Sequence, residues 1–375
     1  MKILYITTIG GTMNFFKNFI RELVEQGHTV DLACNDSVSK PADMYIEIGC
    51  RIYSISTSRS PYSKGNIIAI KQIKKLVEKN GYDIVHCHTP LAAMCTRIAC
   101  RKMRKKGLKV IYTAHGFHFY KGAPLKNWLL YYPIEKICAH WTDTLININL
   151  EDYAFSKKKM KAKRVEYVPG VGVDTSRFDN VSTGREAKRK ELEIPEDATI
   201  VISIGELNAN KNHEAIIRAV AKIPGIYYMI AGKGLLKDYL QNLIDELGIS
   251  DRVKLVGFRR DIGELLNCAD IFAFPSYREG LPVSAMEAMY MGLPVVASDI
   301  RGVRDLIENG KNGYLCNPFD SNTFCEKLTI LADDKKLCEE MGQANKEKVK
   351  NFRMEKVDKT VREIYDAATK QVIRK

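Results

Sequence analysis

The chain has 375 residues, 45% of them hydrophobic and 27% charged, which excludes a disordered chain and favours two globular domains over one. Its formal net charge is +13, and the whole excess lies in residues 1–180, which carry 28 Lys and Arg against 15 Asp and Glu. This asymmetry predicts an anionic partner for the first half: nucleic acid, a phosphate-bearing ligand or acidic lipid. A basic surface that only aids solubility is the alternative.

The first half alternates strand-like apolar runs with helical patterns. The opening run, KILYITT, is too short for a secretory signal and is expected to be a strand. No apolar run in the chain reaches the roughly 18 residues that span a bilayer. The strands expected in this half are 2–8, 30–34, 83–88, 109–115, 144–148 and 164–169.

The second half repeats the pattern after an expected linker, Gly170–Pro195. Continuous apolar strands separated by helices indicate parallel sheets covered on both faces, so the predicted fold class is α/β with two Rossmann-like, doubly wound domains. Their ligand is expected in the cleft between them, beyond the carboxyl ends of the strands. The strands expected here are 199–205, 227–232, 253–258, 270–275 and 294–298, and the domains are 1–180, 181–350 and a helix, 351–375, that crosses back to the first domain.

Gly10 and Gly11 lie between the first expected strand and the first helix. Glycines at such a turn let backbone N–H groups approach a phosphate at a helix N-terminus. The run lacks the G-x-G-x-x-G spacing of dinucleotide sites, and glycine is common in any strand-to-helix turn. On its own, therefore, this is a weak sign of a phosphate site.

The strongest signal is PSYREGLPVSAMEAMYMGLPVVASD, from Pro275 to Asp299. A strand ends, a loop carries Glu279, and a helix begins after Gly280 and Leu281. The free N–H groups at that helix start suit a diphosphate. Glu279 and Glu287 flank the anion site, and each carboxylate offers the two acceptors that paired sugar hydroxyls need. The alternative, that Glu279 caps the helix and Glu287 is a surface residue, fits poorly with the apolar neighbours of Glu287.

The two glutamates and their spacing resemble the retaining glycosyltransferases of family 4, which have the GT-B fold. The resemblance covers nearly the whole chain, and its finer detail, GELNANKNH, is similar to bacterial exopolysaccharide and capsule enzymes. The other matching segments are the Gly-Gly turn, TAHGFHF (113–119), VPGVGVDTSRF (168–178), GELNANKN (205–212), AGKG (231–234), VGFRRD (256–261) and GVRDLIENGKNGYL (302–315).

The resemblance implies roles by position. Glu279 would bind the donor sugar and Glu287 the ribose, while Lys211 would neutralise the leaving diphosphate. His115 would lie at the cleft edge near the donor sugar, and the segment from Phe258 would hold the base. The implied catalytic residues are Glu279, Lys211 and His115. The implied donor-binding residues are Gly10, Gly11, Gly205, Asn208, Lys211, Phe258, Arg259, Glu279, Gly280, Leu281 and Glu287.

One position departs from the family pattern, because Glu206 stands where family members usually carry an arginine that holds the diphosphate. Either Glu206 turns away, or another cation such as Arg259, Arg260 or one from the first domain replaces it. The implied chemistry is substitution at the anomeric carbon with retention, helped by electrostatic stabilisation of the leaving phosphate. No metal and no cofactor is expected, and the donor is expected to be a UDP-sugar, with an N-acetylhexosamine as the transferred group.

The basic first half suggests the acceptor. Cations cluster at 95–109 and 156–164, and Trp128–Tyr132 adds aromatic side chains beside lysines. These residues suit an acidic membrane interface and a saccharide carried on a polyprenyl diphosphate. The aromatic segment has two interpretations, core packing or a lipid- or acceptor-facing surface, and the second is slightly favoured. Peripheral attachment to the inner face of the cell membrane, in the cytoplasm, is the expected location.

Other functions remain as alternatives. They are transfer to a soluble small molecule or a protein, a sugar-nucleotide epimerase and a glycoside hydrolase that uses both glutamates. Nucleic-acid binding rests on charge alone and leaves Glu279, Glu287 and Lys211 unexplained, so no nucleic-acid partner is expected. The ten cysteines form no C-x-x-C pair, and several lie in apolar runs, which indicates free buried thiols in a reducing compartment.

Overall fold

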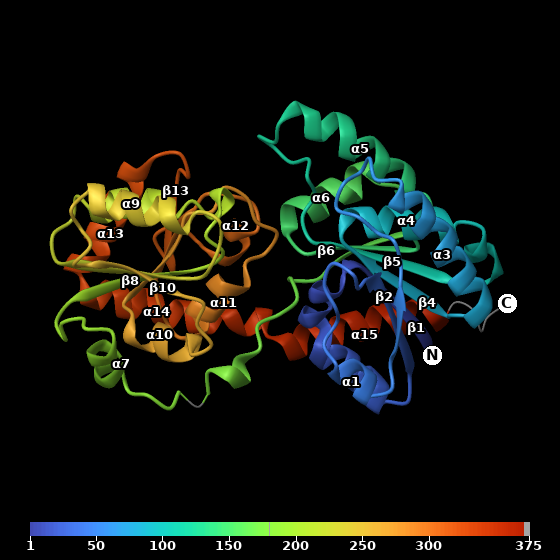
Figure 1. Ribbon diagram of the computed structural model, residues 1–375, viewed down its shortest axis with the longest axis horizontal. Coiled ribbons are helices and arrows are strands. Elements are labelled where there is room, and N and C mark those ends of the chain that lie inside the picture. The colour runs from blue at the N-terminus through green and yellow to red at the C-terminus, as the bar shows by residue number, and fades with distance from the viewer. Residues whose placement is uncertain (180, 371–375) are drawn as a thin grey trace. The chain divides into compact units, whose positions relative to one another are not determined.

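The computed structural model describes residues 1–179 and 181–370 of the chain. They form two compact units, the N-terminal unit (1–171 with the chain from 357 onward) and the C-terminal unit (172–356). The limits of these units differ by several residues from the predicted domain limits. Each unit has helices on both faces of a parallel sheet (Figure 1), which confirms the predicted α/β class.

The N-terminal unit contains a seven-stranded sheet in the order β3-β2-β1-β4-β5-β6-β7, with every neighbouring pair parallel. Strand order reverses between β1 and β4, which is where open α/β sheets bind ligands. The strands are β1 (Lys2–Ile9), β2 (Thr29–Asn35), β3 (Arg51–Ser54), β4 (Ile84–His88), β5 (Lys109–Ala114), β6 (Thr144–Asn147) and β7 (Arg164–Tyr167). The helices are α1 (Lys17–Glu25), α2 (Met44–Glu47), α3 (Gly65–Asn80), α4 (Pro90–Cys100), α5 (Leu125–Ala139), α6 (Leu150–Lys159) and α15 (Met354–Lys370).

The central strand β1 shows why both faces of this sheet need helices. Its side chains alternate between two cores. Leu4 and Ile6 are fully buried with residues of α3 and α4, whereas Ile3 and Tyr5 are buried with residues of α1 and α15. The Tyr5 hydroxyl is 2.6 Å from that of Tyr365 on α15, so the last described helix is part of the N-terminal core.

The C-terminal unit contains a six-stranded parallel sheet in the order β10-β9-β8-β11-β12-β13. Here strand order reverses between β8 and β11. The strands are β8 (Thr199–Ile204), β9 (Ile226–Ala231), β10 (Val253–Gly257), β11 (Ile271–Phe274), β12 (Val295–Ser298) and β13 (Gly313–Cys316). The helices are α7 (Arg185–Glu191), α8 (His213–Val220), α9 (Lys237–Glu246), α10 (Ile262–Cys268), α11 (Val283–Tyr290), α12 (Val303–Leu306), α13 (Ser321–Asp333) and α14 (Lys335–Val349).

All the strands expected from the sequence are present, and two others were not expected. Both β3 and β13 lie at a sheet edge, where one side of the strand has no neighbour. The four residues of β3 are exposed or half-buried, so the strand carries no continuous apolar run. Edge strands are short and partly polar, because a long apolar edge would pair with other chains.

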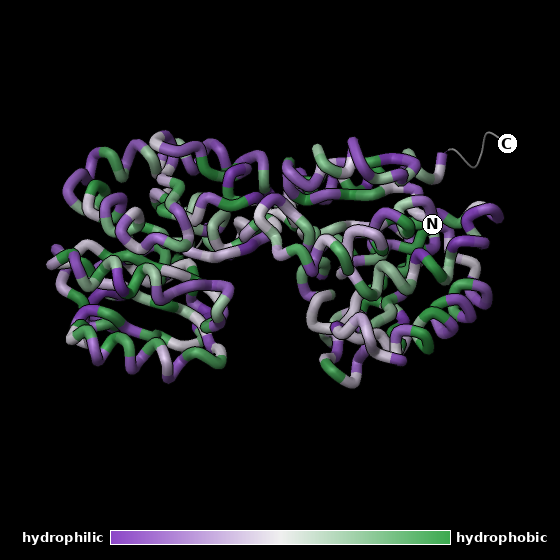
Figure 2. The backbone as a smooth tube through the Cα atoms, turned by 90° about the horizontal axis from the view of Figure 1, so that it is seen from above, coloured by the Kyte–Doolittle hydropathy of each residue, from purple (hydrophilic) through white to green (hydrophobic). Residues whose placement is uncertain are grey.

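Helices such as α1, α8 and α15 are amphipathic, and hydrophilic and hydrophobic residues are interspersed along the chain in both units (Figure 2). Among the described residues, every helix is too short or too polar to cross a membrane.

Two predictions about basic and aromatic surface residues are wrong. Arg97, counted with the surface cations, is 1% exposed and pairs with Glu135 at 2.8 Å over the Tyr112 ring. Trp128 and Tyr132 pack against the N-terminal core, so the favoured surface interpretation fails for these aromatic rings. A helix buries side chains on one face only, and α5 turns its rings inward and leaves aliphatic residues outside.

Candidate active site

Lys211 and Glu279 meet at the point where strand order reverses in the C-terminal unit. Lys211 ends a short 3-10 turn (Ala209–Lys211) after β8, and Glu279 lies in the loop after β11. Because β8 and β11 are neighbouring parallel strands, their carboxyl ends bring the two side chains together. The Lys211 Nζ atom donates to Glu279 Oε1 at 2.8 Å, and the side chains are 21% and 17% exposed.

Local hydrogen bonds hold both loops in place. Asn208 caps the 3-10 turn, because its side-chain oxygen accepts from the Lys211 backbone N–H at 3.1 Å. The Asn210 side chain donates to the Arg278 carbonyl at 3.0 Å, which ties the first loop to the residue before Glu279. The Lys211 ammonium also lies over the Phe274 ring, 5.1 Å from its centroid.

The start of α11 offers backbone donors beside Glu279. In the described part of the chain, the N–H groups of Gly280 and Leu281 have no acceptor. Pro282 takes the N-cap position, so the first N–H groups of α11 also lack partners within the helix. A Cβ atom on Gly302 would lie 1.8 Å from the Gly280 carbonyl oxygen, so glycine at 302 allows this loop to pack closely.

A cavity of about 900 Å³ lies next to this loop system in the C-terminal unit. It contains four of the predicted donor-binding residues, while Asn208, Lys211 and Glu279 are not among its lining residues. The lining residues are Arg177, Ile204, Gly205, Glu206, Ala231, Gly232, Lys233, Gly234, Leu235, Phe258, Arg259, Arg260, Ile262 and Glu287.

Glu287 is the buried acid of this cavity. It lies in α11, is 9% exposed, and its Oε1 is 3.5 Å from an Arg177 guanidinium nitrogen. Burial raises the pKa of Glu287 to about 7, although the nearby Arg177 charge opposes the shift. A buried carboxylate that titrates near neutrality is unusual, and such groups are enriched at functional sites.

Glu206, which stands where family members usually carry an arginine, is among the lining residues of the cavity, and its carboxylate accepts from the Asn208 amide at 3.0 Å. Arg259 is held by Glu191 at 2.9 Å and by Asp261. Lys233 lies over the Phe258 ring, 5.3 Å from its centroid. Arg177 pairs with Glu287, so Lys233 and Arg260 are the lining cations without a carboxylate partner among the described residues, and these two favour an anion.

Sequence reasoning missed Arg177 and Lys233 as site residues. Both lie inside segments that carry the family resemblance, VPGVGVDTSRF and AGKG. Their contribution depends on loops after different strands folding back over one cavity, which a linear pattern does not display.

The predicted residues of the N-terminal unit form a separate group. Gly10 begins a 3-10 turn (Gly10–Phe16) after β1, and its N–H donates to the Ser39 carbonyl at 2.9 Å. A Cβ atom at Gly10 would lie 2.3 Å from Pro41 N, and one at Gly11 would lie 2.9 Å from Ser39 Oγ. Close packing against 39–41 therefore explains glycine at these positions without any ligand.

A smaller cavity, about 240 Å³, lies at the carboxyl ends of β1 and β4. It has one cation, Arg59, and an aromatic wall in which Tyr131 stacks on His118. The lining residues are Thr8, Ile9, Thr12, Arg59, Thr89, Pro90, Leu91, His118 and Tyr131.

His115 directly follows β5, is half-buried, and lies beside the buried imidazoles of His86 and His88. Its Nε2 is 3.1 Å from His88 Nδ1. The His86 ring bonds to the Tyr365 hydroxyl at 2.5 Å and to Thr113 Oγ1 at 2.8 Å. Burial lowers the pKa of His115 to about 4 and that of His86 to about 3, and it also lowers the pKa of His88, so all three rings are neutral near pH 7.

The hydrogen bonding of His88 fixes which nitrogen of His115 carries the proton. His88 Nε2 is buried and has no partner among the described residues. A buried N–H without an acceptor is rarer and more costly than a free lone pair, so His88 carries its proton on Nδ1 and donates to His115 Nε2. His115 then carries its own proton on Nδ1. That side chain is half-buried, so the Nδ1–H group is available as a donor.

Comparison with known proteins decides the family. Residues 2–149 match the family model described as "Glycosyl transferase 4-like", and residues 184–348 match "Glycosyl transferases group 1". EpsD of Bacillus subtilis (strain 168), which is named as a glycosyltransferase, is 38% identical over 373 residues that cover 98% of this chain and 96% of EpsD. The chain belongs to the family 4 glycosyltransferases.

One further relative of this glycosyltransferase is named for its donor and acceptor, and two solved structures share its fold. The UDP-Gal:alpha-D-GlcNAc-diphosphoundecaprenol alpha-1,3-galactosyltransferase of Escherichia coli is 30% identical over 324 residues, 82% of this chain and 81% of that protein. Sucrose-phosphate synthase from Thermosynechococcus elongatus superposes with a TM-score of 0.81 at 19% identity and 98% coverage of both chains. Anabaena HepE in complex with UDP and glucose superposes with a TM-score of 0.79 at 20% identity, and the match covers 98% of this chain and 100% of HepE. These two structures confirm the GT-B fold.

The cysteines of the glycosyltransferase are reduced, as the sequence predicts, and its acidic and histidine side chains form no metal-binding group among the described residues. All ten cysteines are free, and eight are buried. Within residues 1–179 and 181–370 there is no group of three or more His, Cys, Asp or Glu side chains that has the geometry to hold a metal ion. A reducing compartment and metal-independent transfer both stay predictions.

Proposed function

We propose that this glycosyltransferase moves a hexosyl group, an N-acetylhexosamine, from a UDP-sugar to a lipid-linked saccharide with retention of the anomeric configuration. The observation that carries the proposal is the cavity of the C-terminal unit. Buried Glu287 suits the ribose diol, and the cationic lining suits the diphosphate. Lys211, Glu279 and the free amides of Gly280 and Leu281 lie at the end of neighbouring strands.

The comparisons support the choice of donor and acceptor. The Escherichia coli relative is named for a UDP-Gal donor and an acceptor on diphosphoundecaprenol, and HepE was crystallised with UDP and glucose. Glu206 lines the donor cavity without a family arginine, and Lys233 and Arg260 provide positive charge there. The base of the nucleotide would lie against Phe258, which is 65% exposed, on the ring face that Lys233 does not cover.

The proposed reaction exchanges one bond at the anomeric carbon for another. The bond from that carbon to the donor phosphate oxygen breaks, and a bond to an acceptor hydroxyl oxygen forms on the same face of the sugar. The hydroxyl proton passes to the leaving diphosphate, which departs as UDP. Lys211 and the N–H groups at Gly280 and Leu281 stabilise the negative charge that grows on the phosphate oxygens. Glu279 accepts hydrogen bonds from sugar hydroxyls and is not a covalent nucleophile.

The acceptor saccharide would occupy the cavity of the N-terminal unit at the ends of β1 and β4. Stacked Tyr131 and His118 offer a flat surface for a sugar ring, and Arg59 offers a cation for the acceptor phosphate. A lipid-linked acceptor would bring the enzyme to a membrane surface, and we propose peripheral attachment at the cytoplasmic face. Exopolysaccharide or capsule synthesis is the process that such a reaction would serve.

The test is a two-part donor and acceptor screen with the full-length enzyme. First, a panel of UDP- and GDP-sugars is compared by thermal shift, and the UDP-N-acetylhexosamines are expected to give the largest stabilisation. Second, the best donor is offered with a saccharide on polyprenyl diphosphate and with the same saccharide without the lipid. UDP release that requires the lipid-linked acceptor, with an axial product linkage by NMR, is the expected result.

Three outcomes would contradict the proposal. Tighter binding of GDP-sugars would reject the donor, and equal turnover of the lipid-free saccharide would reject the lipid-linked acceptor. An inverted product linkage would reject retention. Donor hydrolysis without acceptor serves as the control, because a hydrolase would release sugar at the same rate in both arms.

A further inference from the structure

Strand β4 places two histidines in the interior of the N-terminal unit. His86 and His88 are two residues apart, so they point to the same face of the sheet, and they are 2% and 1% exposed. Helix α15 covers that face, because its Tyr365 is buried in one cluster with Tyr5 of the neighbouring strand β1. Buried polar rings require hydrogen-bond partners, and those of His86 come from two other elements of the unit.

The Tyr365 hydroxyl connects α15 to this strand. It lies 2.6 Å from the hydroxyl of Tyr5 and 2.5 Å from His86 Nδ1. On the other side of the imidazole, His86 Nε2 is 2.8 Å from Thr113 Oγ1. Thr113 belongs to β5, the strand that His115 directly follows. A continuous series of hydrogen bonds therefore runs from α15 through β4 to β5.

The surroundings of Tyr5 fix the direction in which this series donates. Tyr5 is 1% exposed, and among the described residues its hydroxyl has no partner except Tyr365. If His86 carried its proton on Nδ1, Tyr365 would accept from it and donate to Tyr5, whose own proton would have no acceptor. In the other direction Tyr5 donates to Tyr365, which donates to His86 Nδ1. The proton without an acceptor then belongs to Thr113, which is 7% exposed, so this direction costs less.

The His86 ring in turn supports the ring of His88. The centroids of the two imidazoles are 4.1 Å apart, and the Phe16 ring packs against His88 with its centroid at 4.3 Å. Tyr5 stacks on the same imidazole at 5.5 Å. Three rings therefore hold His88 in the orientation that brings its Nδ1 within 3.1 Å of His115 Nε2. A displacement of His86 reaches His115 through this packing, because a close-packed interior transmits strain.

We propose that Tyr365 is a positioning residue for the transfer reaction. Its hydroxyl fixes the tautomer and the ring orientation of His86. Through the packed His88 ring, it keeps the Nδ1–H group of His115 available as a donor. Helix α15 thereby contributes to the site, although none of its described residues lines either the donor or the acceptor cavity. The inference rests on the proposed role of His115 near the donor sugar, whereas the order of the hydrogen bonds does not depend on that role.

The test is a double-mutant cycle with the full-length enzyme, which measures transfer from the best UDP-sugar of the screen. Tyr365→Phe removes the hydroxyl and keeps the ring, and it is expected to lower kcat about fivefold with little change in KM. In a His86→Leu background the same substitution should change kcat less than about twofold, because its route to His115 is already broken. Equal losses in the two backgrounds would overturn the proposal.

Tyr228→Phe is the matched control. Tyr228 is a fully buried tyrosine of the C-terminal unit, and its hydroxyl donates to Ser203 Oγ at 2.8 Å. Both substitutions remove a buried, hydrogen-bonded hydroxyl, so the melting temperature should fall by a similar amount in the two variants. The control should keep kcat within about twofold of the native value, since an exposed-to-buried hydrogen bond far from catalysis affects stability alone. A loss of kcat in Tyr228→Phe equal to that in Tyr365→Phe would overturn the proposal, because lowered stability would explain both.

Long-range ¹H–¹⁵N NMR of the imidazoles separates a failure of this proposal from a failure of the proposed function. In the native enzyme His86 is expected to carry its proton on Nε2. In Tyr365→Phe the His86 signals should shift towards the Nδ1–H tautomer, and the share of His115 with its proton on Nδ1 should fall.

Two NMR results would overturn the proposal. A native His86 protonated on Nδ1 would reverse the direction of donation, and this measurement decides even if Tyr365→Phe does not fold. An unchanged His115 spectrum in the folded variant would show that Tyr365 does not act on it. Full activity of His115→Ala would instead reject the proposed role of His115, and with it the positioning role of Tyr365, while the order of the hydrogen bonds would stand.

Discussion

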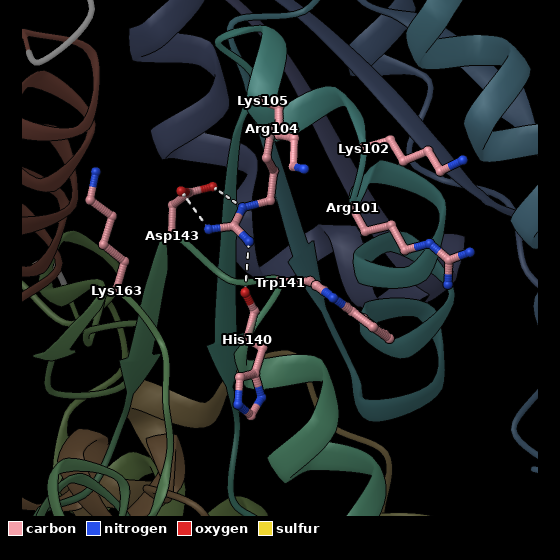
Figure 3. Close-up of a pocket in the computed structure, with 8 residues that line it drawn as sticks. All are labelled: Arg101, Lys102, Arg104, Lys105, His140, Trp141, Asp143 and Lys163. Carbon is pink, nitrogen blue, oxygen red and sulfur yellow. Dashed lines mark hydrogen bonds and ion pairs between the residues drawn. The ribbon is translucent and has the colours of Figure 1, made fainter.

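The two units share an architecture but use their charged residues differently. In the C-terminal unit Lys and Arg balance Asp and Glu almost evenly, and its central cation, Lys211, is paired with Glu279 where β8 and β11 end. In the N-terminal unit a group of cations that includes Arg101, Lys102 and Lys105 lies at the amino edge of the sheet (Figure 3), whereas neutral imidazoles lie at the carboxyl edge. The C-terminal unit thus places its central cation at the carboxyl edge of its sheet, whereas the N-terminal unit has a group of cations at the amino edge of its sheet.

The largest effect on activity is expected when the Lys211–Glu279 ion pair of the C-terminal unit is removed. Lys211→Ala and Glu279→Gln are each expected to lower kcat about 10²–10³-fold, because each removes a group aimed at the reacting donor. Steady-state transfer assays measure the loss, and circular dichroism should show an unchanged fold. Lys336→Ala and Glu340→Gln split an exposed pair of α14 (3.7 Å) and should change kcat less than twofold. Full activity in either site variant would remove these residues from the mechanism.

A second prediction concerns the imidazoles of the N-terminal unit. His88→Leu removes the donor to His115 Nε2 and is expected to lower kcat about tenfold with little change in KM. His88→Asn keeps an N–H near the position of Nδ1 and should recover most of the activity. Long-range ¹H–¹⁵N NMR of the His115 ring should show the proton on Nδ1 in the native enzyme and in His88→Asn. Protonation on Nε2 in the native enzyme would show that His88 accepts instead of donating.

The smallest expected effect is the pH dependence of donor binding, which follows from Glu287. Its pKa is raised to about 7, so the ionised acceptor form is present above pH 7 and is lost as the pH falls. Affinity for a UDP-sugar should therefore drop by up to about tenfold between pH 8 and pH 6. A UDP-sugar is used because the terminal phosphate of UDP titrates in the same range.

The control variant is Glu287→Gln, which should bind the UDP-sugar with little pH dependence. The free energy of unfolding should change with pH in the opposite direction to the affinity for the UDP-sugar. The pKa of Glu287 is higher in the folded protein than in the unfolded chain. Glu287 therefore stabilises the folded protein at low pH, and this stabilisation is lost as the pH rises through 7. Glu287→Gln should therefore melt at a higher temperature than the native enzyme at pH 8. A steep pH dependence of binding in this variant would assign the titration to another group.

The residues around the cavity of the C-terminal unit show which site residues a sequence pattern can predict and which it cannot. Glu279, Gly280 and Glu287 are close in sequence, so their shared helix and loop could be predicted from local signals. Arg177 and Lys233 reach the same cavity from other loops, and Glu206 lines it beside the cations Arg259 and Arg260. Long-range packing sets these positions, and a single sequence does not display it.

Because a single sequence does not display long-range packing, the core was predicted well and the surface poorly. Buried strands such as β1 and β4 are continuous apolar runs, so hydrophobic patterning alone identified both parallel sheets and their helices. Patterning did not identify the edge strands β3 and β13, the burial of Arg97 against Glu135, or the inward turn of Trp128. Each of these depends on a partner far away in the chain. The grouping of Arg101, His140 and Lys163 around one pocket has the same origin, because these residues become neighbours only when β5, β6 and β7 align.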